Sequence, residues 1–422
     1  ASRSRAPIQN LADKVSTYFV PLVVAISILT FIVWALWGPE PVYVFALVNA
    51  IAVLIIACPC ALGLATPMSV MVGVGRGAQS GVLIKNAEAL EKMDKIDTLI
   101  IDKTGTITEG KPSVEKVGSF DDKTDDDDDD DDDDDVLQFM GSLNQMSEHP
   151  LAAAIVDFAQ KKELSLLKVD EFKAITGKGA QALIDGKQIA IGNDKMMLQA
   201  GAALSKQQIE VAEQFQNQGK TVSFLSIEGT VTGYVVISDA IKGTSAKAIK
   251  ELQDQGISVM MLTGDNEYTA KYVADTLQLS AYKAACLPED KLKEIEKLQG
   301  QGHVVAMAGD GINDAPALAK SDVGIAMGTG TDVAIESASI TLVKGDLHGI
   351  VKAKNLGHQV MSNIKQNLFF ALVYNTIGVP VAAGVLYPVF GILLSPMIAA
   401  LAMSFSSVSV IANALRLKNV KI

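Results

Sequence analysis

The chain has 422 residues, of which 49% are hydrophobic and 20% are charged. This length is enough for two or three domains, and the composition excludes a chain that is wholly water-soluble or wholly embedded in a bilayer. The formal net charge is −12, but eleven consecutive aspartates at residues 125–135 supply nearly all of it, since the remainder sums to −1. No cluster of Lys and Arg indicates nucleic-acid binding, and three cysteines exclude a disulfide scaffold.

Four apolar stretches predict membrane-spanning helices, at residues 17–37, 42–64, 368–390 and 392–415. Each approaches the roughly 20 residues that cross a bilayer, and buried core helices are the alternative. Lys and Arg flank the long segment between the second and third stretches and occur in both tails, so the positive-inside rule places tails and segment in the cytoplasm. No cleavable signal peptide is visible. We therefore expect two membrane hairpins joined through a cytoplasmic head.

The second stretch contains Cys58-Pro59-Cys60. Residues two apart on a regular helix point about 200° from each other, but Pro59 breaks the local hydrogen bonding, so that both sulfurs can converge. Two soft thiolates suit Cu(I) far better than Ca²⁺ or Mg²⁺. The alternative is a pair of buried structural cysteines beside a kink. The remaining cysteine, Cys286, is interpreted as a buried structural thiol.

The head is predicted to contain parallel strands at residues 98–101, 257–262, 304–308 and 323–327, each followed by a Gly, Asp or Thr cluster. Open α/β sheets place ligands at this carboxyl edge. A second block, residues 111–229, interrupts the pattern after its first strand. Gly219-Lys220-Thr221 ends like a Walker A loop, but position 214 is Gln, so that match fails.

The first strand leads into Asp102-Lys103-Thr104-Gly105-Thr106. A carboxylate at a strand end, beside a cation and hydroxyls, suits a phosphoryl acceptor, with a turn-capping Asp as the alternative. Further along come Thr263-Gly264-Asp265, Lys291 and residues 309–314, Gly-Asp-Gly-Ile-Asn-Asp. Asp310 and Asp314 suit hard Mg²⁺, and Lys291 supplies a point charge for phosphate.

These motifs, in this order, resemble the P-type ATPases, whose catalytic domain has the haloacid-dehalogenase fold. The resemblance implies that ATP phosphorylates Asp102 and that Mg²⁺ is bound by Asp102, the Thr104 carbonyl, Asp310 and Asp314. It also implies a catalytic set around them: Lys103, Thr106, Thr263, Gly264, Asp265, Lys291 and Asn313. Hydrolytic relatives usually have a second Asp where Thr104 stands. Thr cannot act as their general acid or base, so an acyl phosphate should persist.

The Cys-Pro-Cys motif resembles the heavy-metal, P1B-type branch of this family. Ser147-Glu148-His149-Pro150 is also typical, and the resemblance implies an ATP-binding set of Glu148, His149, Gly177, Gly179, Gly192 and Asn193. A surface histidine and ordinary glycine turns are the alternative. In the last two spans, Met403, Ser406 and Ser407 share one helix face. With Tyr374 and Asn375 they resemble the copper(I)/silver subgroup, since the membrane Lys and Asp of zinc relatives are absent between residues 368 and 415.

The predicted fold class is multi-domain: an α-helical transmembrane bundle with four spans, and an α/β haloacid-dehalogenase-like phosphorylation domain with an inserted α+β nucleotide-binding domain. The first hairpin, with the Cys-Pro-Cys motif, is assigned to residues 1–76, and the second, with the tail, to 351–422. The phosphorylation domain takes residues 77–110 and 230–350, and the nucleotide-binding domain 111–229. Eleven like charges at 125–135 should be extended and disordered, with no assignable catalytic role.

The predicted function is ATP-driven export of Cu(I) across a membrane. The resemblance implies parts not found here, namely N-terminal spans, a soluble metal-binding domain and an actuator domain, since the chain has neither Thr-Gly-Glu nor Cys-x-x-Cys. We expect such a fragment to bind ATP and Mg²⁺ but not to pump alone. Its partners would be the bilayer, the missing domains and a copper chaperone or periplasmic acceptor. The bacterial inner membrane is the expected location, with an organellar membrane as the alternative. Rival functions are an Ag(I) or Zn²⁺ pump, a membrane-tethered phosphatase, and a metal-binding module with a degenerate head.

Overall fold

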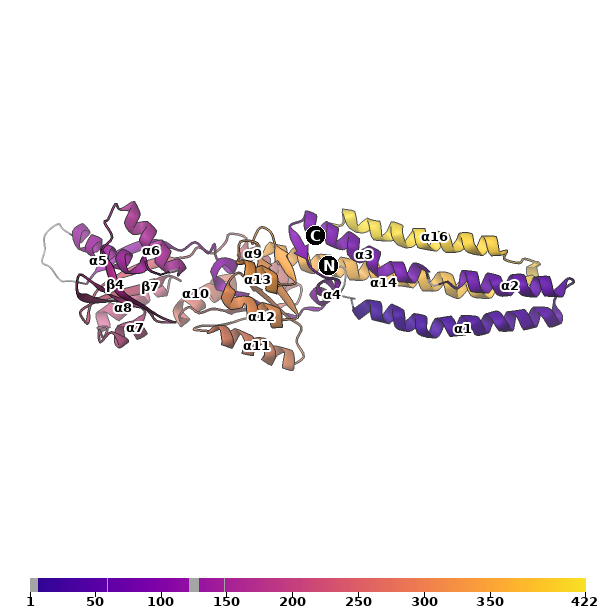
Figure 1. The fold of residues 1–422 in the computed structure, drawn as a ribbon, viewed down its shortest axis with the longest axis horizontal. Helices are drawn as coiled ribbons and strands as arrows, with labels where there is room; N and C mark the ends of the chain where they lie inside the picture. Colours follow the sequence, from indigo (N-terminus) through magenta and orange to yellow (C-terminus); the bar gives the residue numbers. More distant parts are fainter. Residues whose placement is uncertain (1–6, 59, 121–128, 148) are drawn as a thin grey trace. The chain divides into compact units, whose positions relative to one another are not determined.

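The computed structural model describes residues 7–58, 60–120, 129–147 and 149–422. The chain folds as two compact units (Figure 1). The helical unit comprises residues 1–96, 339–343 and 349–422, and the α/β unit comprises residues 97–338 and 344–348. Each unit is described separately below.

The helical unit is built mainly from long apolar helices, among which α1, α2, α3 and α16 pack against one another (Figure 1). Its helices are α1 (Pro7–Trp37), α2 (Val42–Ile56), α3 (Cys60–Gln79), α4 (Ala87–Lys95), α14 (His348–Ala382), α15 (Tyr387–Phe390), α16 (Pro396–Leu415) and the 3₁₀ turn η3 (Arg416–Asn419). A short antiparallel pair joins β1 (Val82–Ile84) to β13 (Ile340–Leu342). Small side chains such as Ala52, Ala382 and Ala399 are fully buried, which lets the helices approach closely.

Three segments of the described chain are long and apolar enough to cross a membrane: Thr17–Trp37, Val42–Gln79 and Pro396–Asn419. They match three of the four predicted spans. The predicted span at 368–390 is not among them. Its helix, α14, ends at Ala382, and Gly384 follows with a φ of +90°. The apolar sequence continues to residue 390, but the helix ends eight residues earlier, at Ala382. Hydropathy alone does not reveal the turn that interrupts this apolar stretch.

The Cys-Pro-Cys motif coincides with a break between two helices. Helix α2 ends at Ile56 and α3 begins at Cys60, as the proline predicts. Pro59 itself lies outside the described residues. The two sulfurs do converge, but the structure joins Cys58 and Cys60 in a disulfide rather than leaving the two free thiolates that were expected.

A buried polar network joins α3, α14 and α16. Ser69 Oγ donates to Asn363 Oδ1 at 2.8 Å, and Asn367 Nδ2 donates to Ser69 Oγ at 3.0 Å. Asn413 Nδ2 donates to Asn367 Oδ1 at 2.9 Å. We refer to Ser69, Asn363, Asn367 and Asn413 as the asparagine network. Hydrogen-bonded polar groups of this kind offset the cost of burying amides among apolar helices.

The α/β unit contains the parallel sheet that the sequence predicts. Its strands follow the order β12-β11-β2-β9-β10, and all neighbouring pairs among them are parallel. Their bounds are β2 (Thr98–Asp102), β9 (Ser258–Leu262), β10 (Ala281–Lys283), β11 (Val305–Gly309) and β12 (Val323–Met327). All four predicted strands are confirmed. The associated helices are α9 (Ser245–Asp254), α10 (Glu267–Leu277), α11 (Pro288–Gly300), α12 (Ala315–Lys320) and α13 (Asp332–Ser337).

A six-stranded antiparallel sheet is inserted after β2, in the order β3-β8-β7-β6-β5-β4. Its strands are β3 (Ser113–Ser119), β4 (Val169–Ile175), β5 (Gly179–Ile184), β6 (Lys187–Gly192), β7 (Thr221–Ile227) and β8 (Thr230–Ser238). Helices α5 (Asp129–Asn144) and α6 (Pro150–Lys161) share one apolar core with it, and α7 (Asp194–Gln199) and α8 (Lys206–Gln216) share another. Alternate strand residues enter each core, as the pleat requires. Because β8 pairs with β3, the inserted sheet ends at Ser238, nine residues beyond the predicted boundary at 229.

Where the structure describes the aspartate run, it differs from the prediction. Residues 121–128 lie outside the described chain, but α5 begins at Asp129, so residues 129–135 are helical and not extended. The helix continues into Leu137, Met140 and Leu143, which are fully buried in the core of the inserted sheet. Asp134 pairs with Lys162 at 2.6 Å. Acidic residues are also favoured in the first turns of a helix, so the packed apolar end stabilises the charged one.

Candidate functional site

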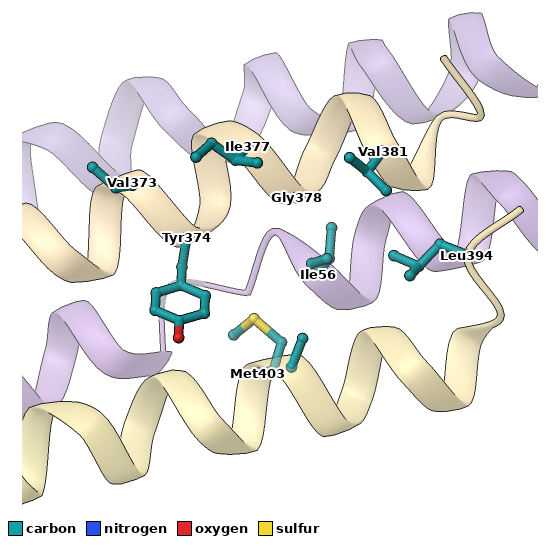
Figure 2. A pocket seen from close by; sticks show the side chains of 9 residues that line it. Ile56, Val373, Tyr374, Ile377, Gly378, Val381, Leu394 and Met403 are labelled. Atoms are coloured by element: carbon teal, nitrogen blue, oxygen red, sulfur yellow. The ribbon is translucent and has the colours of Figure 1, made fainter. Parts of the chain in front are cut away.

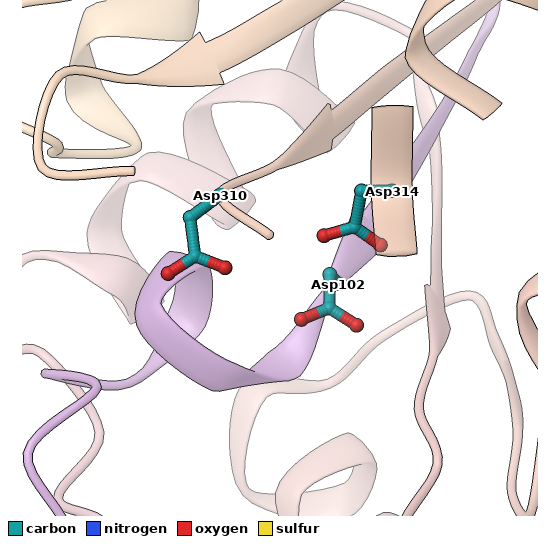
Figure 3. A group of neighbouring side chains, drawn as sticks. All are labelled: Asp102, Asp310 and Asp314. Atoms are coloured by element: carbon teal, nitrogen blue, oxygen red, sulfur yellow. The ribbon is translucent and has the colours of Figure 1, made fainter. Parts of the chain in front are cut away.

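Three carboxylates meet at the carboxyl edge of the parallel sheet. Asp102 ends β2, Asp310 directly follows β11, and Asp314 closes a short 3₁₀ turn after it. One oxygen from each lies within 4.8 Å of the others (Figure 3). β2 and β11 are parallel neighbours, so their ends deliver Asp102 and Asp310 to the same place.

Lys291, from α11, supplies the cation of this cluster. Its Nζ lies 2.5 Å from Asp102 Oδ1 and 2.7 Å from Asp314 Oδ1, and all three side chains are buried. Burial raises the pKa of Asp102 to about 7. Attraction to Lys291 acts in the opposite direction, and repulsion from Asp314 and Asp310 offsets part of that attraction. Burial would lower the pKa of Lys291, but attraction to Asp102 and Asp314 raises it above its usual value. The three carboxylates therefore hold more negative charge than the Lys291 ammonium neutralises.

The loop after Asp102 packs directly on Asp310. Gly105 has a φ of +68°, and a Cβ placed on it would lie 1.7 Å from Asp310 Oδ2, so only glycine fits there. Thr104 is exposed, whereas Thr106 is buried and its Oγ1 has no hydrogen-bond partner in the described part of the chain. An unpaired buried hydroxyl is costly unless a ligand satisfies it.

The Thr263–Gly264–Asp265 turn lies beside the same loop. Asp265 forms an ion pair with Lys103, and Thr263 Oγ1 donates to Asp265 Oδ2 at 2.9 Å. Asn313, by contrast, is exposed. Cys286 is half-buried, close to Gly264, and burial raises the pKa of its thiol. Ion pairs thus link Lys103 to Asp265 and Lys291 to Asp102. Asn313 lies next to Asp314 in the same short turn but is exposed, and the roles of the predicted catalytic residues remain predictions.

The carboxylate cluster fits Mg²⁺. Its donors are hard oxygens, and burial together with repulsion from Asp314 raises the pKa of Asp310 to about 6. Carboxylates that resist ionisation because of one another are stabilised by a divalent cation between them. Asp102, Asp310 and Asp314 are the side chains placed to hold it.

Four of the residues predicted to bind ATP gather at one end of the inserted sheet. Gly179 pairs with Gly192 across β5 and β6, and a Cβ on either would lie within about 2.2 Å of a backbone carbonyl. Asn193 Nδ2 donates to the Gly177 carbonyl at 3.0 Å, while its Oδ1 caps α7. His149 caps α6, and burial lowers the pKa of its imidazole. Glu148 lies outside the described residues.

Two of the predicted metal ligands line a pocket in the helical unit (Figure 2). Tyr374 from α14 and Met403 from α16 face it, together with Ile56, the last residue of α2. Asn375 and Ser406 are buried but do not line this pocket, and neither does Ser407. The walls are otherwise aliphatic, so the pocket alone offers one thioether and one phenol.

The sequence did not indicate that Lys242 belongs to the surroundings of this site. This lysine follows β8, where the chain returns from the inserted sheet, and its Nζ donates to three backbone carbonyls, two of them in the loop after Asp102. Nearby, Asp239 Oδ2 accepts from Thr108 Oγ1 at 2.6 Å. Neither contact follows a recognisable spacing, because each depends on segments more than 100 residues apart in sequence.

Comparisons with known proteins define the class first. Residues 96–322 match the haloacid dehalogenase-like hydrolase family. The catalytic domain of the CPx-ATPase CopB-B superimposes with a TM-score of 0.51 at 32% identity, covering 66% of this chain and 96% of that domain. A zinc-transporting PIB-type ATPase in the E2.Pi state aligns with a TM-score of 0.74 at 33% identity, over 98% of this chain and 64% of that one.

Curated relatives agree with this class. A copper-exporting P-type ATPase of Legionella pneumophila is 56% identical over the whole chain, which covers 56% of that protein. A silver exporting P-type ATPase of Salmonella typhimurium is 53% identical, again over the whole chain and over 50% of the relative. The chain belongs to the PIB-type, or CPx, branch of the P-type ATPases, and it spans about half the length of the curated relatives it matches.

Proposed function

We propose that this chain is the catalytic and metal-conducting part of an ATP-driven pump that exports Cu(I) through an aspartyl-phosphate at Asp102. One observation carries the proposal: Asp102 is buried at the end of β2, paired with Lys291 and adjacent to two further carboxylates. The relatives named as copper and silver exporters support the choice of a soft monovalent ion.

In the proposed reaction, an Asp102 oxygen attacks the γ-phosphorus of ATP and displaces ADP. Lys291 already lies 2.5 Å from that carboxylate, so its ammonium is in place for the charge of the incoming phosphoryl group. Thr106 Oγ1 and Lys103 lie in the same loop, as donors to the phosphoryl oxygens. Mg²⁺, held by Asp102, Asp310, Asp314 and the Thr104 carbonyl, would neutralise phosphate charge when bound.

The acyl phosphate should survive long enough to drive a conformational change. Thr104 is the residue two positions after the nucleophile, and its hydroxyl cannot serve as a carboxylic acid or base for water attack. The described residues around Asp102 include the carboxylates of Asp310 and Asp314, which we assign to cation binding instead. Sustained phosphatase turnover by the chain would contradict this assignment.

The transported ion would meet sulfur ligands at the α2–α3 break. Cys58 and Cys60 bind Cu(I) only as thiolates, so their disulfide must first be reduced. Met403 and Tyr374 lie in the adjoining pocket, next to Ile56. We further propose that Asn375, Ser406 and Ser407 belong to the same path, with the head cytoplasmic and the pump in a bacterial inner membrane.

The test is metal-stimulated phosphorylation of the complete native protein. Purified pump in reducing buffer is incubated with labelled ATP and Mg²⁺ plus Cu(I), Ag(I) or Zn²⁺, and acid-stable, hydroxylamine-sensitive label is measured. We expect Cu(I) and Ag(I) to stimulate labelling, Asp102→Asn to abolish it, and Cys58→Ser to remove the metal stimulation. Label that persists in Asp102→Asn would overturn the assignment of the nucleophile, and stimulation by Zn²⁺ alone would overturn the choice of cargo.

A further inference from the structure

Lys242 places a single ammonium among three backbone carbonyls. Its Nζ donates to Gly105 O at 2.7 Å, to Thr106 O at 3.1 Å and to Gly345 O at 2.8 Å. The side chain is half-buried. Hydrogen bonds from a charged donor are stronger than those from a neutral one, so this group fixes the backbone of both segments that it contacts.

The first of these segments sets the geometry of the carboxylate cluster. Gly105 and Thr106 belong to the loop that starts at Asp102, and Gly105 packs on Asp310 Oδ2. A displacement of the Gly105 carbonyl would therefore move the loop against Asp310. The printed hydrogen bonds of the Lys242 ammonium go to backbone carbonyls, so its hydrogen bonds act on the carboxylates through the loop. Its charge also acts directly on Asp310, whose pKa it lowers against the larger effect of burial.

The second segment is the lead into α14. Gly345 lies in residues 344–348, which belong to the α/β unit, and α14 begins at His348. Thr244 Oγ1 donates to Asp346 Oδ1 at 2.9 Å, and the same oxygen accepts from His348 N at 2.9 Å. The start of α14 at His348 is thus anchored three residues after the Lys242 contact at Gly345.

We propose that Lys242 is a positioning residue for Mg²⁺ binding and phosphoryl transfer at Asp102, acting through the Gly105 and Thr106 carbonyls and anchored at Gly345. The part concerning phosphoryl transfer rests on the proposed function. The part concerning Mg²⁺ does not, because it requires only the carboxylate cluster and the loop packed on it. Loss of the ammonium removes three hydrogen bonds at once from carbonyls of buried residues.

The experiment compares Lys242→Met, Lys242→Gln and Lys242→Arg in the complete native protein, with Lys250→Gln as matched control. Lys250 is an exposed lysine on α9, eight residues after Lys242. Its replacement by Gln removes the same charge without disturbing a buried contact. Mg²⁺ is titrated against thermal unfolding without ATP, and then against phosphoenzyme formation. We expect the Mg²⁺ half-saturation to rise about 10–100-fold in Lys242→Met, the range found for groups that orient metal ligands.

Lys242→Arg should recover part of this loss, and Lys250→Gln should match the wild type. Lys242→Gln retains N–H donors without charge and serves if the methionine variant does not fold. A half-saturation within twofold of the wild type, even with less phosphoenzyme, would mean a merely structural role and would overturn the inference. If the wild type forms no phosphoenzyme but Lys242→Met still weakens Mg²⁺ binding, the proposed function fails and the positioning role stands.

Discussion

Replacing Lys291 with Met should destabilise the α/β unit strongly. Lys291 Nζ contacts Asp102 at 2.5 Å and Asp314 at 2.7 Å, and the three side chains are 8%, 11% and 3% exposed. Water therefore screens this cluster little. Methionine keeps the length of the side chain but leaves two carboxylates buried without their cation.

The expected loss is about 3–5 kcal/mol, the cost of removing one partner from a buried ion pair, and not the 0–1 kcal/mol of a surface pair. In a domain of about 150–250 residues, each kcal/mol corresponds to roughly 2–4 °C in melting temperature. The variant should therefore melt about 6–20 °C below the wild type. Lys293→Met is the matched control, because Lys293 lies on the same helix but is 69% exposed, and such substitutions usually stay within about 0.5 kcal/mol.

The pH dependence gives the reasoning a second check. Without Lys291 the folded protein takes up a proton on Asp102, whose pKa is already raised to about 7 by burial, whereas the unfolded chain stays ionised near neutral pH. The folded state then binds more protons, so its stability rises as pH falls. In metal-free buffer the deficit of Lys291→Met should be smaller at pH 5 than at pH 8.

The assay is thermal unfolding of the purified chain in detergent, followed by a signal from the α/β unit. Asp314→Asn should partly rescue Lys291→Met, because it removes one of the two unpaired charges. A deficit equal to that of Lys293→Met, or additive losses in the double variant, would refute the view that Lys291 neutralises this cluster.

Three further predictions concern other features. Mg²⁺ at about 100 times its dissociation constant should stabilise the wild type by about 2.7 kcal/mol, and Asp310→Asn should lose most of this gain; an undiminished gain would exclude Asp310 as a ligand. Gly105→Ala should abolish the Mg²⁺ effect, because its Cβ would lie 1.7 Å from Asp310, whereas Gly256→Ala, with a φ of +81° and no atom within 4 Å, should show only the cost of about 1–2 kcal/mol for a left-handed residue; equal behaviour would refute the clash. Asn367→Ala should cost about 1–3 kcal/mol in thermal unfolding by leaving its partners in the asparagine network unpaired, and a negligible change would mean that water replaces the amide.

Much of the fold was predictable because burial leaves a local signature. The strand at 98–101 is fully buried and reads as an unbroken apolar run, and the polar residues after it mark the carboxyl edge. The phosphate motifs were equally visible in the sequence, since Asp102 and Asp310 each come at the end of a short apolar run. Their neighbourhood follows from sheet topology alone.

The features that were missed depend on long-range packing. The helical state of residues 129–135 follows from the burial of Leu137 and Met140 against the inserted sheet, which composition does not encode. Helix α14 ends at Ala382 because the backbone turns inside an apolar run, where the hydropathy of the side chains does not change. Lys242 is recognised only by carbonyls, and every residue type presents those, so no side-chain pattern could have indicated it.

The two connections between the parallel sheet and the inserted sheet lie side by side. β3 and β8, the first and last strands, are paired, and Thr108 forms a bridge with Ile241 just outside them. Paired strands lie only about 5 Å apart. The chain therefore leaves and re-enters the fold of the parallel sheet at nearly the same point, and the insertion is a loop with its two ends close together. The entropy of closing such a loop grows only logarithmically with its length. The host fold can thus tolerate insertions of very different size at this point, and the inserted sheet can gain or lose residues without disturbing the order of strands beneath it.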